Sequence, residues 1–111
     1  MKRLACCVAG IIGLALAGAV PAAGNPERGK EKAAQVCAAC HGAEGNKPVD
    51  PTNPILAGQY YDYLVRALTD YKIGRRNNPI MKGFAGQLSK QDIEDLAAWF
   101  SSQSSPLRDQ R

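Results

Sequence analysis

The sequence predicts an all-α fold in which three main helices are joined by two long loops. Apolar residues recur at helical spacing in three segments, namely residues 26–39, residues 59–73 and the segment after Ser89. Proline, glycine and asparagine are concentrated in the segments between them, 42–58 and 75–87. Neither loop shows a strand pattern, so no sheet is expected.

The first helix is predicted from Pro26 to Ala39. Asn25 is a typical N-cap, and proline is well suited to the first helical position that follows it. The small and apolar positions that share one face are Gly29, Ala33, Val36, Cys37 and Cys40. Both cysteines should therefore lie on the inward face near the end of this helix, before Gly42 and Gly45 stop it.

The second helix is expected over 59–73 and ends at Gly74. Its apolar stripe consists of Tyr61, Leu64, Val65 and Leu68. The third helix begins after Ser89, where Asp92 stands at the third position of a capping box. Its stripe consists of Ile93, Leu96, Ala97 and Phe100. The segment 75–87 is expected to be loop.

Residues 1–23 have the pattern of a secretory signal peptide. Met1-Lys2-Arg3 is basic, residues 4–20 carry no charge, and small residues surround the expected cleavage site at 20–23. The alternative is a retained membrane anchor, but the apolar run is shorter than the ~20 residues that a spanning helix needs. We expect cleavage, so that residues 24–111 form the exported domain and Cys6 and Cys7 are lost.

The exported domain is small and only mildly basic. It has 88 residues (111 − 23), and loss of Lys2 and Arg3 leaves 12 Lys+Arg against 10 Asp+Glu, a net charge of +2. This balance does not indicate a nucleic-acid-binding protein. A domain of this size with two long loops usually needs a disulfide, metal or cofactor to organise it.

The stretch CAACHG, residues 37–42, is the chemically informative motif. It contains the two cysteines of the exported domain, Cys37 and Cys40, and the one histidine of the chain, His41. Four interpretations compete: a structural disulfide, a zinc site, a thioredoxin-like redox pair and a covalent haem site.

The first three interpretations have physical weaknesses. A disulfide between Cys37 and Cys40 would close a very short loop and constrain the unfolded chain little. A structural zinc site needs four ligands, and this cluster supplies three at most. A redox pair should stand at the start of a helix, where the dipole lowers the thiol pKa, whereas this pair is expected near a helix end.

Covalent haem c suits the spacing better. Two thiols three residues apart can each bond one vinyl group of a haem, and the histidine that follows can bind its iron. Met81 is then the candidate for the second axial position, since it is the one thioether of the exported domain. A lone methionine usually fills a core, but Met/His ligation is typical of haem electron carriers.

Together these residues resemble a class I c-type cytochrome, most closely the small bacterial mono-haem proteins and one half of the two-haem bacterial kind. The resemblance spans the whole exported domain and rests on CAACHG and on NPIMKGFAGQLSKQDIEDLAAWF. It implies the cytochrome c fold, with helices and long loops wrapped around one covalent haem. A second attachment motif, which two-haem relatives need, does not occur in this sequence.

The resemblance also implies roles for individual residues. Gly29 matches a glycine that lets the first and last helices cross closely, and Trp99 matches the aromatic residue that packs there. Pro54 matches the proline whose backbone carbonyl accepts a hydrogen bond from the free imidazole nitrogen of His41. Candidates for contact with the haem propionates, by position and polarity alone, are Tyr60, Tyr61, Arg66 and Asn77.

The implied function is that of a soluble periplasmic electron-transfer protein and not of an enzyme. Apolar residues expected around the haem are Ile55, Leu56, Leu64, Leu68, Ile80, Phe84 and Leu96. Two alternatives stay open: a haem c subunit of a larger dehydrogenase or oxidase, and a haem enzyme or gas sensor with an open iron position. No small-molecule substrate is expected.

A basic rim is expected on either side of Met81, formed by Lys72, Arg75, Arg76 and Lys82. It would steer redox partners that carry acidic docking surfaces. The alternative is an ordinary solvated loop surface, on which isolated charges contribute little.

Overall fold

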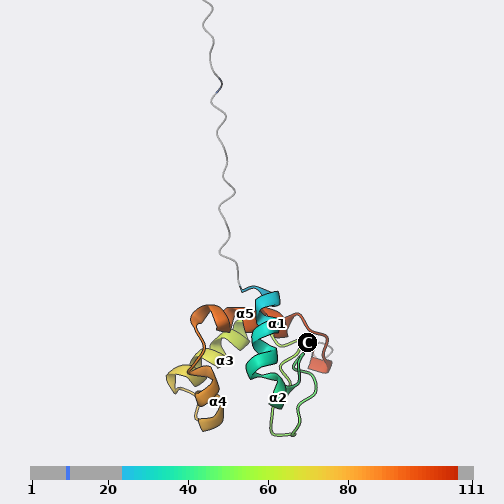
Figure 1. Cartoon of the computed structure of the whole chain (residues 1–111), viewed down its shortest axis with the longest axis vertical. Helices are drawn as coiled ribbons and strands as arrows, with labels where there is room; N and C mark the ends of the chain where they lie inside the picture. The colour runs from blue at the N-terminus through green and yellow to red at the C-terminus, as the bar shows by residue number, and fades with distance from the viewer. Residues whose placement is uncertain (1–9, 11–23, 108–111) are drawn as a thin grey trace, which may run out of the picture.

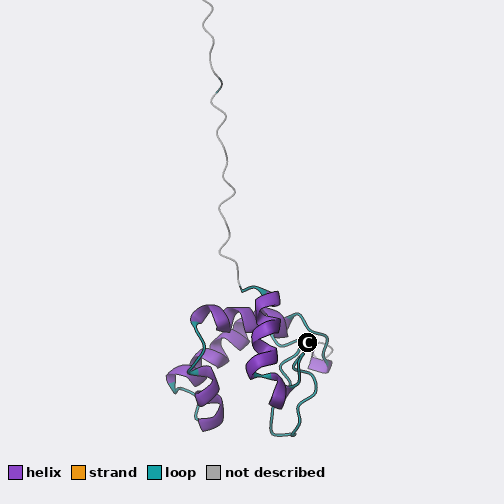
Figure 2. Ribbon diagram, in the orientation of Figure 1, coloured by secondary structure: helices purple, strands orange, loops and turns teal. Residues whose placement is uncertain are grey.

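The computed structural model describes Gly10 and residues 24–107, and these residues form a helical domain (Figure 1). The predicted signal peptide lies almost entirely outside the described residues. The helices are α1 (Pro26–Val36), α2 (Ala38–His41), α3 (Tyr61–Ile73), α4 (Pro79–Ala85) and α5 (Lys90–Ser101). Figure 2 shows helices and loops and no strand in the described part, which confirms the all-α prediction.

Within the described residues, none of the helices combines the length and the apolar character that crossing a membrane requires.

The first predicted helix is interrupted at Cys37, which is a correction to the continuous helix expected over 26–39. The side chain of Asn25 caps α1 as expected, accepting from the backbone N–H groups of Glu27 and Arg28. Cys37 then has φ −114° and ψ −33°, away from the ~−63° of a regular helix, and it serves as both C-cap of α1 and N-cap of α2. Ala38 and Ala39 are good helix formers, so their composition does not reveal the break.

The predicted loop 75–87 contains a helix, α4, and that prediction was wrong. Asn78 caps this helix by accepting from the N–H groups of Ile80, at 3.1 Å, and Met81, at 3.0 Å. Pro79 occupies the first helical position. The pair Asn78-Pro79 is the same start signal as Asn25-Pro26, so the helix has a clear physical cause. Met81 consequently stands in the first turn of a helix rather than in a loop.

The helices α1 and α5 lie side by side and contact each other extensively (Figure 1), and Gly29 of α1 lies against α5. A Cβ atom at Gly29 would lie 2.0 Å from the backbone oxygen of Asp95 and 2.8 Å from the Cβ of Trp99. Only glycine therefore fits this position. The Trp99 indole N–H donates to the backbone oxygen of Ala43 at 3.0 Å. This hydrogen bond ties the loop after α2 to α5.

An ion pair between the buried carboxylate of Asp95 and the mostly exposed guanidinium of Arg28 supports this crossing. The Asp95 carboxylate is 5% exposed and accepts from Arg28 Nε at 3.0 Å. It also accepts from the backbone N–H of Asn25 at 2.6 Å and from the side-chain amide of Gln91 at 2.8 Å. Burial alone would raise the pKa of Asp95, yet these hydrogen bonds together hold that pKa below its usual value.

The third predicted helix is confirmed, including its start. In α5 the Ser89 hydroxyl accepts from the N–H of Asp92, and the Asp92 carboxylate accepts from the N–H of Ser89, both at 2.9 Å. The apolar side of α5 packs between α1 and α3. The buried core consists of Ala33, Leu64, Ala85, Leu88, Ile93, Leu96, Ala97 and Phe100.

Candidate functional site

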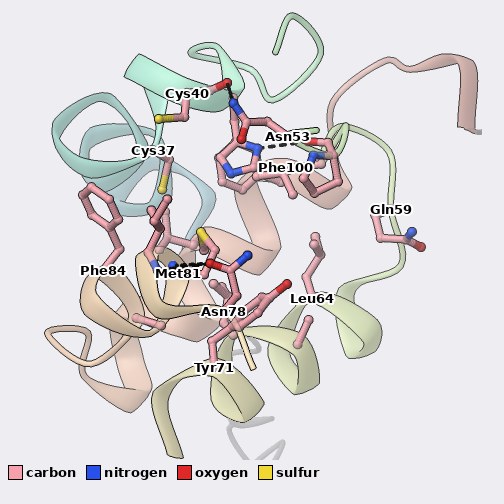
Figure 3. A pocket seen from close by; sticks show the side chains of 18 of the residues that line it. Cys37, Cys40, Asn53, Gln59, Leu64, Tyr71, Asn78, Met81, Phe84 and Phe100 are labelled. Carbon is pink, nitrogen blue, oxygen red and sulfur yellow. Dashed lines mark hydrogen bonds between the residues drawn. The ribbon is translucent and has the colours of Figure 1, made fainter. Parts of the chain in front are cut away.

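A cavity of about 540 Å³ opens between α2, α3, α4 and the loop that precedes α3 (Figure 3). All five predicted site residues line it: Cys37, Cys40, His41, Pro54 and Met81. The seven apolar residues expected to surround the haem also line it: Ile55, Leu56, Leu64, Leu68, Ile80, Phe84 and Leu96. The structure thus brings together residues that span more than half of the exported domain.

His41 is buried and its orientation is set by a hydrogen bond. The residue is 6% exposed, and its imidazole Nδ1 lies 2.9 Å from the backbone oxygen of Pro54. A carbonyl oxygen can only accept, so Nδ1 is the protonated nitrogen and donates. The lone pair is therefore on Nε2, which is the tautomer that a metal-binding imidazole needs.

The loop around Pro54 is tied to α2 at further points. The side-chain amide of Asn53 donates to the backbone oxygen of Cys40 at 3.2 Å. The N–H of Val49 donates to the same oxygen at 3.1 Å. These two bonds give the Cys40 carbonyl, which lies near the C-terminal end of α2, its hydrogen-bond donors. They also hold the loop so that the Pro54 carbonyl stays next to the imidazole.

Cys37 and Cys40 are both free thiols in this structure, and Figure 3 shows their sulfur atoms at the cavity. Burial, together with the neighbouring Cys40, raises the pKa of Cys37 to about 11. A thioredoxin-like pair needs a lowered thiol pKa, so this environment is the opposite of what that interpretation requires. Within the described residues no group of three or more His, Cys, Asp or Glu side chains is placed to hold a metal ion.

Met81 reaches the cavity from α4, whereas Cys37 and Cys40 reach it from the break after α1 and from α2 (Figure 3). Its position follows from the Asn78 cap, because the cap sets where the first turn of α4 begins. Ile80 and Phe84, on the same helix, line the cavity as well. Met81 thus lies at the cavity with the other predicted site residues, but in a helix and not in the loop that the sequence predicted.

The four residues predicted to contact the haem propionates do not line the cavity. The polar residues that line it there are Gln59, Tyr63, Tyr71 and Arg76. Arg66, for example, is directed to Asp70 at 3.9 Å and is 80% exposed. One sequence pattern does indicate the tyrosines of the cavity wall. Tyr63, Ala67 and Tyr71 recur every four residues, which places them on one face of α3.

Arg76 is held by two phenols. Its Nη2 donates to the Tyr63 hydroxyl at 2.9 Å and its Nη1 donates to the Tyr71 hydroxyl at 3.5 Å. The guanidinium carbon also lies 5.5 Å and 5.3 Å from the centres of those two rings. These contacts place a fixed positive charge and two hydroxyl groups in the cavity wall.

The four residues of the predicted basic rim differ in their surroundings. Lys72 donates through Nζ to the backbone oxygens of Gly86 and Leu88, and Arg76 is bound by the two tyrosines. Arg75 and Lys82 are exposed. The rim is therefore partly built into the fold.

The donor set fits a covalently held haem. Two thiols, one imidazole with its lone pair on Nε2 and one thioether share a largely apolar cavity, which is the chemistry of a His/Met haem c site. Cavities of a few hundred Å³ are typical of cofactor sites.

Comparison with known proteins agrees with this chemistry. The family model described as Cytochrome c matches residues 26–104. Cytochrome c4 of Pseudomonas aeruginosa is 47% identical over 93 residues, which are 84% of this chain and 45% of that protein. A thiosulfate dehydrogenase electron acceptor of Stutzerimonas stutzeri is 33% identical over 110 residues, which are 96% of this chain and 51% of that protein.

The fold comparison gives the same result. The crystal structure of reduced recombinant cytochrome c4 from Pseudomonas stutzeri superposes with a TM-score of 0.69 at 44% sequence identity. The match covers 75% of this chain and 47% of that one, so the chain spans about half the length of these relatives. With a family model that matches most of the described residues and a helical fold that matches a solved member, the chain belongs to the cytochrome c family.

Proposed function

We propose that the protein is a one-electron carrier that binds a single haem c through Cys37 and Cys40, with His41 and Met81 as axial ligands to iron. The observation that carries this proposal is the convergence of all four side chains on one cavity. The haem supplies the iron that gains and loses the electron. The chain supplies attachment, ligation, orientation and exclusion of water.

Each part of the cavity has a role in this function. The Pro54 carbonyl orients His41 and keeps its proton on Nδ1. Met81 contributes a soft thioether, which favours reduced iron and raises the potential. The apolar lining formed by residues such as Leu64, Leu68 and Leu96 keeps water away and disfavours the additional positive charge of the oxidised state.

An electron carrier is favoured over a haem enzyme or gas sensor by the surroundings of Met81. If Met81 occupies the sixth position, no site is left for an exogenous substrate. Along α4, the residue that carries a titratable side chain is Lys82, which is exposed and does not line the cavity. Peroxide chemistry needs a positioned acid or base near the iron, and α4 offers none.

A spectroelectrochemical titration of the haem-loaded protein tests the proposal. We expect one reversible transition that follows a one-electron Nernst curve, with the same spectra in both directions. The protein should also fail to accelerate peroxide consumption by a reducing dye above the rate of free haem. A second transition, or turnover of peroxide, would support the enzyme interpretation.

A haem c domain of a larger redox assembly is the second candidate, because the chain spans only about half of relatives such as the P. aeruginosa protein. It uses the same site chemistry. The molecular mass of the native holoprotein in a periplasmic extract distinguishes the two, since a free carrier elutes at the size of the domain.

The partners are proposed to be other redox proteins. A relative is named as an electron acceptor for thiosulfate dehydrogenase, and the same type of protein-to-protein transfer is proposed here. Arg75 and Lys82, the exposed members of the basic rim, would steer partners with acidic surfaces. The transfer rate should then fall as ionic strength rises, and Arg75→Gln with Lys82→Gln should flatten that dependence.

Export to the periplasm is proposed from the signal pattern of residues 1–23. The haem-loaded protein purified from cells should have a mass that starts at residue 20, 23 or 24 rather than at Met1. A mass that retains Met1 would favour a membrane anchor instead.

A further inference from the structure

The helix that carries Met81 has little apolar contact with the rest of the protein. Of the seven residues of α4, Ala85 alone is buried. Ile80, Met81 and Phe84 line the cavity, and Ile80 and Phe84 are 70% and 43% exposed, so their side chains are not packed in the protein core. Within the described residues, α3 is the element against which α4 packs most extensively. Polar contacts with α3 must therefore contribute much of what holds α4 in place.

Lys72 provides such a contact at the C-terminal end of α4. It stands in the last turn of α3, and its Nζ donates to the backbone oxygen of Gly86 at 3.2 Å and to that of Leu88. Gly86 is the C-cap of α4 and Leu88 lies two residues beyond it, so one ammonium group binds the cap carbonyl and a carbonyl of the turn that follows. A cation at this position also interacts favourably with the helix dipole.

Arg76 provides the corresponding contact at the N-terminal end. It lies two residues before the N-cap Asn78 and is bound to the hydroxyl groups of Tyr63 and Tyr71 on α3. The two ends of α4 are thus tied to one helix by two cationic side chains. Arg76 lines the cavity, whereas Lys72 does not. Lys72 can therefore act on Met81 only through the position of α4.

We propose that Lys72 is a positioning residue for Met81, holding α4 against α3 and so setting how firmly Met81 stays at the sixth position. This inference rests on the proposed axial role of Met81. When the bonds from Lys72 are broken, α4 can swing away from α3 and carry Met81 with it. Hydrogen bonds to a charged group contribute enough that their loss should raise the population of the open form about tenfold.

Cyanide binding to the oxidised, haem-loaded protein measures this opening. Cyanide can bind only when Met81 has left, so its second-order binding rate constant, measured at low cyanide concentration, is proportional to the population of the open form. We expect Lys72→Leu to bind cyanide about tenfold faster than the unchanged protein. Lys72→Arg, which keeps a cationic donor, should restore most of the slow rate, and Lys72→Gln should be intermediate.

Two control variants separate positioning from charge and from overall stability. Arg75→Leu removes the same charge from an exposed residue in the neighbouring turn. Asn25→Ala removes the side-chain cap of α1, which lowers the stability of the whole domain at a helix that does not contain Lys72 or its acceptors. Both should bind cyanide at the unchanged rate. Hydrogen exchange of the α4 amides should be faster in Lys72→Leu and unaltered in both controls.

The outcomes distinguish this inference from the proposed function. If Lys72→Leu binds cyanide no faster than Arg75→Leu, or if Asn25→Ala is equally fast, the positioning role is wrong. If the unchanged protein lacks a spectral band that depends on Met81, the proposed ligation fails. The exchange of the α4 amides then still decides whether Lys72 holds this helix, because it does not depend on the ligand. Equal exchange in Lys72→Leu and Arg75→Leu would refute that as well.

Discussion

The imidazole Nδ1 of His41 donates to the backbone oxygen of Pro54 across 2.9 Å, although the two residues are 13 positions apart. The bond sets both the proton position and the direction of the ring. A chain without secondary structure between residues 42 and 58 is brought back to α2 by this bond and by the Asn53 amide, which donates to the Cys40 oxygen. The loop therefore holds in place the imidazole that is proposed to bind iron.

This arrangement predicts a protected imidazole proton. In nitrogen-edited NMR spectra of the reduced holoprotein, the Nδ1 proton of His41 should exchange slowly with water, because it is buried and hydrogen-bonded. Asn53→Ala should accelerate the exchange by releasing the loop from α2. Thr52→Ala should not, since that hydroxyl donates to Asp50 within the loop. Rapid exchange in the unchanged protein would contradict the hydrogen bond.

Substitution of the cysteines should convert covalent attachment into dissociable binding. We expect the haem of the unchanged protein to resist extraction with acidic acetone, since two thioether bonds hold it. Cys37→Ala and Cys40→Ala should each leave one bond, visible as a shift of the reduced pyridine adduct spectrum. The double variant should release its haem. Retention of haem by the double variant after extraction would show that attachment does not use this motif.

Gly29→Ala should destabilise the domain by about 3 kcal/mol, measured by urea unfolding. The new Cβ would meet the backbone of Asp95 at 2.0 Å, so α1 and α5 would have to separate. Gly83→Ala is the matched control, because a Cβ at that helical position meets no atom within 4 Å. It should be neutral or stabilising by up to about 1 kcal/mol. Equal effects of the two substitutions would show that the crossing is not close.

Asp95 should make stability depend on pH in the acid range. Its pKa is lowered in the folded state, so its contribution is complete above the ordinary aspartate pKa of about 3.9 and is lost as pH falls through the lowered value. Asp95→Asn should cost on the order of 2 kcal/mol at neutral pH.

The free energy of unfolding of Asp95→Asn should also fall less steeply between about pH 4 and pH 2. Glu31→Gln, an exposed position on α1, serves as the control and should follow the unchanged protein. Parallel curves for Asp95→Asn and the unchanged protein would show that the ion pair with Arg28 is not the source of the acid sensitivity.

Much of the site could be predicted because its chemistry is local in sequence. The motif CAACHG places three donors within five residues, and α1, α3 and α5 follow apolar stripes with standard caps. The helix α4 is hard to predict because Pro79 and Gly83 are typical of loops, although Asn78-Pro79 is also typical of a helix start.

What could not be predicted depends on tertiary contacts. The break at Cys37 occurs between residues that favour a helix, so packing rather than propensity decides it. The sequence does not show which polar residues face the cavity. Whether a residue such as Arg76 lines it depends on which face of α3 points inward and on the conformation of the turn before α4. The role of Lys72 requires knowing that α4 ends beside α3.

The proposed electron carrier requires that His41 and Met81 both bind the iron. The most direct test is the visible spectrum of the haem-loaded protein, oxidised and reduced, with and without carbon monoxide, compared with Met81→Ala. We predict a low-spin reduced spectrum that carbon monoxide does not change, and a weak iron–sulfur band in the oxidised protein that disappears in Met81→Ala. A high-spin spectrum that shifts with carbon monoxide in the unchanged protein would contradict the claim.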